Sequence, residues 1–332
     1  MVNIKNNKKR ITMSDIAKKL NVSTMTVSKA FQNSPDISLQ VKEKVLKTAS
    51  ELGYVYSKGE PIQLLILFSE AFSSKEEMFY SSAFKRINNL AMTKNIQTST
   101  VLITKEEENK LAIPFANIKA DAIIIMGQFS KEYVKEVIKV QPKTVLFDFF
   151  YYDLELDSVV TDNYFAGYIA TQYLIDLGYQ NIGFVGTLNT TMSIDDRYMG
   201  YSRALVQANY PIDKKYIVND RNENNQIIDF KLPSKLPEAF VCNNDYTAYL
   251  LIQKLSKASY RVPEDISIIS FDDVIYSQIS SPPITTIKVS RNDMANETIK
   301  LILRRIKNPS IWHRRVTMSV RIIERESVKK EN

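Results

Sequence analysis

Polar residues stand directly after most of the short apolar runs of this 332-residue chain. Six runs stand out: Leu64–Phe68, Ala122–Met126, Val145–Phe147, Ile182–Val185, Ala239–Cys242 and Ile266–Ser270. The residues just beyond such strands are Ser69-Glu70, Gly127-Gln128, Asp148, Asp162-Asn163, Gly186, Asn244-Asp245 and Asp272-Asp273. Hydroxyl, carboxylate and amide groups of this kind could hydrogen-bond a small polyhydroxylated molecule.

The side chains that carry most hydrolytic and metal-dependent chemistry are nearly missing. The chain has one histidine, His313, and one cysteine, Cys242, which cannot build a common zinc site or a Ser-His-Asp or Cys-His centre. No GxxxxGK[ST] loop, GxGxxG turn or GxSxG elbow occurs. The aspartate pairs could hold Mg²⁺, but helix caps are the favoured interpretation. We therefore expect no enzyme activity, no cofactor and no metal.

Helical patterns separate the apolar runs, at about 77–94, 131–140, 164–177, 197–209, 245–258 and 291–306. This β-α-β-α order predicts an α/β body with two doubly wound parallel sheets, one in each of two lobes. We expect lobe one at about 62–160 and 289–319, and lobe two at about 161–288 and 320–327. Ligands of such sheets bind beyond the carboxyl ends of the strands, where the polar residues lie.

The net charge of +7 lies entirely at the N-terminal end. Residues 1–58 hold eleven lysines and arginines but four acidic residues, whereas the remaining residues hold 33 of each sign. A basic end on a neutral body is typical of a nucleic-acid-binding module, because lysine and arginine neutralise phosphates. A basic solubilising tail would give the same charge distribution.

Helix signals favour the nucleic-acid-binding module. Thr12-Met-Ser-Asp15 is typical of a capping box, Asn21 suits a left-handed turn, and Ser23 can cap a second helix over 24–31. A third helix is predicted to start near Ser38 and to end before Gly53. Three short helices in this order predict a helix-turn-helix head at 1–57, followed by a linker at 58–61 and the body at 62–327.

The segments IAKKLNVSTMTVSKAFQNSPDIS and VKEKVLKTASELGY resemble the N-terminal signature of the lactose/galactose-repressor (LacI/GalR) family. The resemblance continues through Asp157–Asn163, Leu177–Gly186, Asp196–Tyr201, Asn244-Asp245, Arg261–Ser267, Ser270–Asp273, Pro283–Thr286 and Arg325–Ser327. It implies a two-lobed body like that of periplasmic sugar-binding proteins, a homodimer, and control of transcription by a repressor.

In that family the second helix enters the major groove, and the matching positions here are Thr24, Met25 and Lys29. Lys29 could donate to guanine O6 and N7, and the other two could touch a thymine methyl group. The resemblance also assigns phosphate contacts, which hold the register, to Thr12, Ser23, Thr26, Ser28, Asn33 and Tyr54. For each hydroxyl the alternative is a helix cap or a solvated side chain.

The resemblance further implies effector-binding positions at Ser69, Asp148, Arg197, Asn244 and Asp272. The effector would be a sugar or sugar derivative held between the lobes. Alternatively, Asp245 and Asp272 could cap helices, and Arg197 could pair with Asp195 or Asp196. One or two of the aromatic residues nearby in sequence could stack on a sugar face. Such residues are more often core than binding residues, so most are left out of the site: Phe72, Phe79, Tyr80, Phe149, Phe150, Tyr151 and Tyr276.

The linker departs from the family pattern, because Gly53-Tyr54 is followed only by Val-Tyr-Ser-Lys-Gly-Glu-Pro. The family's hinge helix, with its minor-groove leucine, is expected to be absent. Two hypotheses remain. The first is a dimeric repressor on an inverted repeat in double-stranded DNA. The alternative is a sugar-sensing module with weakened DNA binding, acting through ligand or protein contacts. With no signal peptide and no membrane span expected, either would be cytoplasmic.

Overall fold

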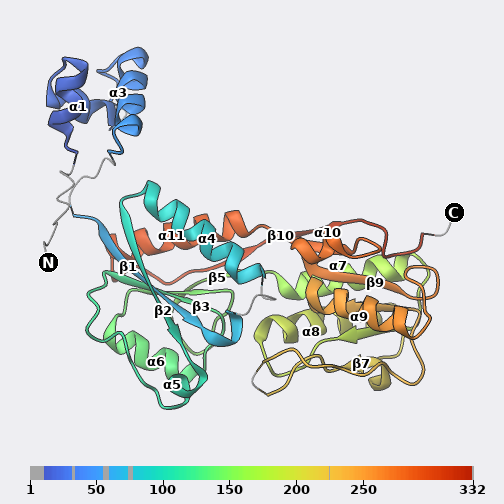
Figure 1. Cartoon of the computed structure of the whole chain (residues 1–332). Coiled ribbons are helices and arrows are strands. Elements are labelled where there is room, and N and C mark those ends of the chain that lie inside the picture. Colours follow the sequence, from blue (N-terminus) through green and yellow to red (C-terminus); the bar gives the residue numbers. More distant parts are fainter. Residues whose placement is uncertain (1–10, 32–33, 55–59, 74–77, 224, 331–332) are drawn as a thin grey trace, which may run out of the picture. The chain divides into compact units, whose positions relative to one another are not determined.

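The computed structural model describes residues 11–31, 34–54, 60–73, 78–223 and 225–330. The chain forms two compact units, a helical head and an α/β body (Figure 1). Residues 55–59, which include the start of the predicted linker at 58–61, and the predicted DNA contact Asn33 lie outside the described residues.

The head consists of α1 (Met13–Leu20), α2 (Thr24–Phe31) and α3 (Leu39–Glu51). Thr12 caps α1 through the predicted capping box, in which the Thr12 amide donates to Asp15 Oδ2 at 2.8 Å. Asn21 has the expected left-handed conformation, with φ of 53°, and Gly53 follows α3 with φ of 69°. The three helices enclose one small core made of Ile16, Ala17, Val27, Ala30, Val45 and Ala49.

The first sheet of the body has the strand order β11-β5-β4-β3-β1-β2. Its strands are β1 (Ile62–Ser69), β2 (Ile96–Ile103), β3 (Ala122–Met126), β4 (Thr144–Phe147), β5 (Asp157–Thr161) and β11 (Arg315–Met318). The pairs β1–β3, β3–β4, β4–β5 and β5–β11 are parallel. The central strands are buried on both faces, which is why they read as continuous apolar runs.

The second sheet has the order β12-β10-β9-β8-β6-β7. Its strands are β6 (Ile182–Val185), β7 (Ile217–Val218), β8 (Ala239–Cys242), β9 (Ser267–Asp272), β10 (Thr285–Val289) and β12 (Val320–Ile323). The predicted parallel sheet is confirmed, with one exception at its edge, where β12 pairs antiparallel with β10.

Helices cover both faces of each sheet (Figure 1). The first lobe contains α4 (Met78–Thr93), α5 (Lys105–Asn109), α6 (Lys131–Val140) and α11 (Arg291–Lys307), with the short η1 (Glu70–Phe72) after β1. The second contains α7 (Asn163–Asp176), α8 (Met192–Gln207), α9 (Asp245–Lys257), α10 (Ile275–Ile279) and the short η2 (Lys214–Tyr216). The short α5 and α10, like the edge strands, were not predicted.

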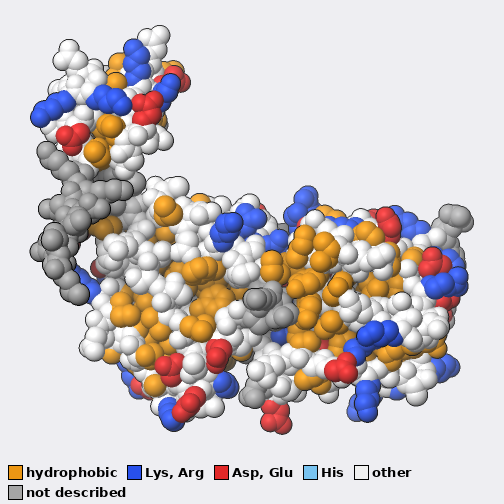
Figure 2. Space-filling model, viewed as in Figure 1, with side chains coloured by type: hydrophobic (Ala, Val, Ile, Leu, Met, Phe, Trp, Pro, Cys, Tyr) orange, Lys and Arg blue, Asp and Glu red, His pale blue; other side chains and the backbone are white. Residues whose placement is uncertain are grey.

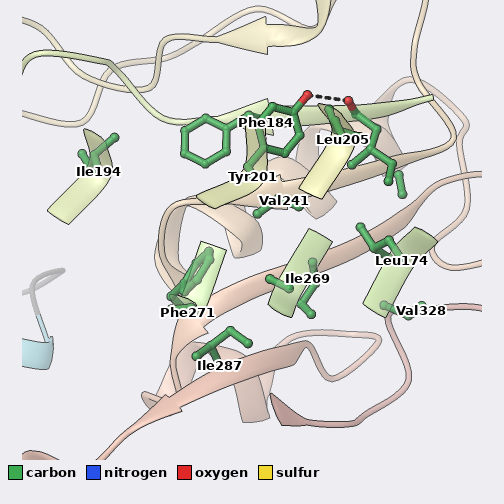
Figure 3. Close-up of a cluster of buried hydrophobic side chains, with 14 residues drawn as sticks. Leu174, Phe184, Ile194, Tyr201, Leu205, Val241, Ile269, Phe271, Ile287 and Val328 are labelled. Atoms are coloured by element: carbon green, nitrogen blue, oxygen red, sulfur yellow. Dashed lines mark hydrogen bonds between the residues drawn. The ribbon is translucent and has the colours of Figure 1, made fainter. Parts of the chain in front are cut away.

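One core of the second lobe lies between its sheet and the helices α7 and α8, and another lies on the side of α9. In the first of these cores, Phe184, Val241, Ile269 and Phe271 of the strands pack against Tyr201 of α8 (Figure 3). The buried Tyr201 hydroxyl is satisfied because it donates to the backbone carbonyl of Ile182 at 2.7 Å. This packing fixes α8 against the strand ends.

No helix within the described part of the chain has the length and apolar character needed to cross a membrane.

Candidate functional site

The exposed face of α2 carries the residues predicted to read DNA bases. Thr24 and Met25 lie in its first turn, and 68% of the Met25 surface is exposed. Lys29 is the single charged residue of α2 and lies one turn further along. All three belong to one helix, so the structure presents them together.

Three of the hydroxyl groups predicted to contact phosphate, those of Thr12, Ser23 and Thr26, already have partners within the head. Ser23 Oγ accepts from the Thr26 amide at 3.0 Å and lies 2.9 Å from Thr26 Oγ1, which caps α2. Thr12 Oγ1 donates to Asp15 Oδ2 at 2.6 Å. Tyr54 packs against the Phe31 ring, with 5.6 Å between the ring centroids. Ser28 is half-buried on α2.

Asp36 is a residue that the sequence analysis missed. It lies in the turn between α2 and α3, and its Oδ2 is 2.9 Å from Lys29 Nζ. The hydrogen bond from Lys29 lowers the pKa of Asp36 below its usual value, so this carboxylate stays charged at neutral pH. The cation expected to reach a guanine is therefore paired with an anion while the head is free.

We expect Asp36→Asn to raise affinity for non-specific DNA by roughly three- to tenfold at low salt, because one repulsive charge near the phosphates is removed. Glu51→Gln is the matched control, since Glu51 pairs with Lys19 at 3.4 Å on other helices. Gel shifts on random-sequence DNA measure both variants. Equal gains in the two variants would show that only net charge matters.

Arg197 of α8 is the centre of a buried polar cluster in the second lobe. Its Nε donates to Asn163 Oδ1 at 2.9 Å, Nη1 donates to the Asn243 carbonyl, and Nη2 lies 3.3 Å from Asp272 Oδ1. The guanidinium carbon also stands 4.8 Å from the centroid of the Phe271 ring. Arg197 therefore pairs with Asp272, rather than with Asp195 or Asp196.

Two of the expected effector positions have backbones that non-glycine residues rarely adopt. Asp148, just after β4, has φ of 72°, and Asp272, at the end of β9, has φ of 100°. Such conformations persist where the surroundings enforce them, and they cluster at binding sites. Asp148 Oδ2 accepts from the Tyr80 hydroxyl at 2.8 Å. Asp272 caps no helix, because the N-cap of α10 is Val274.

Asp148, Arg197, Asn244 and Asp272 line one small pocket between the two lobes, with a volume of about 30 Å³. Asn244 also caps α9, because its Oδ1 accepts from the Thr247 amide at 2.8 Å. Ser69 is buried at the end of β1 and is not among the residues that line this pocket. Four of the five predicted effector positions are therefore brought together.

The aromatic residues Phe72, Phe79 and Tyr80 line the same pocket from the first lobe. The sequence had placed these rings in the core rather than in the site, and all three are in fact buried, so they serve as core residues and as pocket lining at once. Arg221 lines the pocket too, and its neighbour Asp220 accepts from Asn243 Nδ2 at 2.6 Å. Asp220 and Arg221 follow β7, and a two-residue strand leaves no pattern in a sequence.

Asp245 is a fully buried carboxyl group in the second lobe. It accepts from the hydroxyls of Ser270 and Thr286 and from the Val274 amide. Burial raises its pKa to about 7, with a further contribution from the nearby Asp272 charge. It sits in the first turn of α9, whose cap is Asn244.

The raised pKa of Asp245 predicts a pH-dependent stability. The folded state binds the proton more tightly than the unfolded chain, so this contribution is complete below about pH 4 and is lost as pH rises through about 7. We expect the free energy of unfolding to fall by a few kcal/mol over that interval, and Asp245→Asn to reduce the slope. Urea titrations at several pH values measure it. If the slope of the free energy of unfolding against pH were unchanged in the variant, the pH dependence would come from other groups.

Among the described residues, no three His, Cys, Asp or Glu side chains are grouped as a metal site would require.

Two family models match the chain. Residues 12–57 match the bacterial regulatory proteins of the lacI family, and residues 171–328 match the periplasmic binding protein-like domain. The HTH-type transcriptional repressor PurR of Vibrio campbellii is 27% identical, over 97% of this chain and 99% of its own length. The ribose operon repressor of Haemophilus influenzae is 26% identical, over 96% of this chain and 98% of its own.

The solved complex of the transcriptional regulator CelR with cellobiose has a TM-score of 0.69 at 20% identity, over 96% of this chain and 100% of that one. This match shows a common fold. A helix-turn-helix head followed by a periplasmic-binding-protein-like body defines a DNA-binding transcription regulator with an effector-binding body. The head is therefore a helix-turn-helix of the lacI family of bacterial regulatory proteins, and the chain as a whole is similar to repressors such as PurR over nearly its full length.

Proposed function

We propose that this regulator represses transcription as a homodimer bound to an inverted-repeat operator, and that a carbohydrate bound between the lobes of its body changes operator affinity. The observation that carries the effector half is the Arg197 cluster, which faces Asp148 and Tyr80 of the other lobe across one pocket. A ligand that bridges the two sides stabilises one relative placement of the lobes, and thereby couples to the DNA-binding state.

Carbohydrate is the ligand class that this pocket chemistry favours. Its carboxylates accept hydrogen bonds, its two guanidinium groups donate them, and its two amide side chains do both, while the aromatic rings offer apolar faces for a sugar ring. The relatives support the class, because one is named as the ribose operon repressor and a structural neighbour holds cellobiose. We also infer that the protein regulates rather than catalyses, and that it works in the cytoplasm, where its DNA is.

Dimerisation is supported by exposed apolar side chains on α10. Ile275 and Ile279 are 44% and 58% exposed, and Figure 2 shows hydrophobic side chains gathered over this part of the body. Exposed apolar patches of this kind mark protein interfaces. A dimer with two-fold symmetry requires two inverted half-sites.

A gel shift on the protein's own promoter region, with and without candidate sugars, tests the proposal. We expect a specific, salt-dependent complex whose affinity changes with one of the sugars. No specific complex at low salt would favour the alternative, a sugar-sensing module with weakened DNA binding.

Lys29→Ala should weaken specific operator binding by about 10- to 100-fold, because one lysine contact to guanine O6 and N7 is lost. Non-specific binding should fall much less, since it depends on the whole basic head. Competition gel shifts against random DNA give both affinities. Equal losses would place the reading surface elsewhere in the head.

A further inference from the structure

The cleft between the lobes has two compartments of very different size. The inner one, around Arg197, measures about 30 Å³ and the outer one about 910 Å³. They adjoin at η1, since Glu70 and Ala71 line the outer compartment and Phe72 lines the inner. The inner compartment has room for one or two water molecules, whereas sites for small-molecule ligands commonly measure about 300–1,000 Å³.

The outer compartment is rich in the groups that recognise sugars. Three amide side chains line it from the second lobe, namely Asn225, Gln226 and Gln253, together with the ring of Tyr246. Amides donate and accept at adjacent atoms, which matches vicinal hydroxyl groups, and an aromatic ring can pack against the apolar face of a pyranose.

The charges around this compartment are largely neutralised by one another. Lys254 hydrogen-bonds Asp229 and stands 5.1 Å from the centroid of the Phe230 ring. Lys105 pairs with Glu108 at 3.1 Å. Phosphate recognition usually requires donors that converge on one point without carboxylates beside them. The outer compartment therefore suits a neutral polar ligand better than an anionic one.

Hydrogen bonds connect the outer compartment to Arg197. Asn225 Oδ1 accepts from Arg221 Nη1 at 3.1 Å, while its buried Nδ2 donates to no acceptor among the described residues. Arg221 lines the inner compartment, and its neighbour Asp220 holds the Asn243 side chain. The Asn243 carbonyl in turn accepts from Arg197. A ligand on Asn225 would thus act on the same cluster as a ligand on Arg197.

We infer that the outer compartment is a second sugar subsite, so that the effector is an oligosaccharide of two or more units rather than a monosaccharide. This rests on the proposed function, which makes the effector a carbohydrate. One terminal unit lies against Arg197 and Asp272 once the aromatic side chains give way. The next unit lies among Asn225, Gln253 and Tyr246.

Isothermal titration of the full-length protein against a defined sugar panel tests this inference. The panel is glucose, galactose, fructose, ribose, cellobiose, maltose, lactose, sucrose, raffinose and maltotriose. We expect at least one di- or trisaccharide to bind about 30-fold more tightly than any of its component monosaccharides, as two added hydrogen bonds would give.

Gln253→Ala should lower the affinity for that di- or trisaccharide by about tenfold and leave the affinity for monosaccharides unchanged. Gln180→Ala, an exposed glutamine of the same lobe that does not line the compartment, is the control and should change neither. A monosaccharide that binds as tightly as every larger sugar, or equal losses for both sizes in Gln253→Ala, overturns the inference while the carbohydrate effector stands. If no sugar in the panel binds, the carbohydrate effector falls as well.

Discussion

Arg197→Ala is expected to abolish the response to effector while operator binding without effector persists. The substitution removes the donors to Asn163, to the Asn243 carbonyl and to Asp272. Deleting one partner of a buried ion pair typically costs about 3–5 kcal/mol, because the other charge is left uncompensated. That cost falls on folding stability. Effector affinity falls for a separate reason, because the charged guanidinium donors to the ligand are lost and each contributes about 1.5–3 kcal/mol. We therefore expect effector affinity to fall by more than about 100-fold.

Arg203→Ala is the matched control, since Arg203 is an exposed arginine on the same helix. Titration calorimetry measures effector affinity, and a gel shift in the absence of effector shows that the variant is folded. Arg197→Lys separates charge from shape, because lysine keeps the charge but loses the planar fork. A normal effector response in Arg197→Ala would mean that the ligand binds outside this pocket.

The parts of the fold that could be predicted from sequence are those with a strong local pattern. Strands such as β3 are buried on both faces and read as unbroken apolar runs, and α6 has the predicted bounds of 131–140. β5 was missed because its sequence, Asp-Ser-Val-Val-Thr, mixes polar and apolar residues. Asp157 is nevertheless fully buried there, because Arg305 of α11 pairs with it at 2.8 Å. That partner lies 148 residues away in sequence and carries no local signal.

In the candidate site, too, residues with a local sequence signal could be predicted and residues that depend on distant contacts could not. Residues at strand ends could be identified because the carboxyl edge of a parallel sheet binds ligands. Phe72 and Tyr80 could not be distinguished from core residues, because their contact with the site depends on how the first lobe meets the second. Asp36 was missed for a similar reason. Its contact with Lys29 depends on the turn between two helices rather than on helical spacing.

Gly167→Ala is expected to destabilise the fold strongly. A Cβ atom built on this residue of α7 would lie 2.0 Å from the backbone carbonyl oxygen of Arg197 on α8. The opposing Gly200 of α8 has the same relation to the Tyr164 carbonyl of α7, again at 2.0 Å. Neither backbone oxygen can move without displacing its helix. The two glycines therefore set how closely α7 and α8 approach, and with it the position from which Arg197 reaches Asp272.

Replacing glycine by alanine inside a helix ordinarily stabilises a protein by about 0.5–1 kcal/mol. Here we expect the opposite sign, a loss of about 3 kcal/mol or more in the free energy of unfolding. The added methyl group would clash with backbone atoms, which cannot move aside without moving the whole helix. Urea unfolding measures the change in the free energy of unfolding. The control is Met199→Ala, at an exposed position on α8. Its free energy of unfolding should stay within about 0.5 kcal/mol of that of the parent, because alanine has only a slightly higher helix propensity than methionine. Effector affinity should also fall in Gly167→Ala, because α8 carries Arg197 and must move for the methyl group to fit. A stabilised Gly167→Ala would mean that the helices do not approach this closely, and the placement of Arg197 against Asp272 would then need revision.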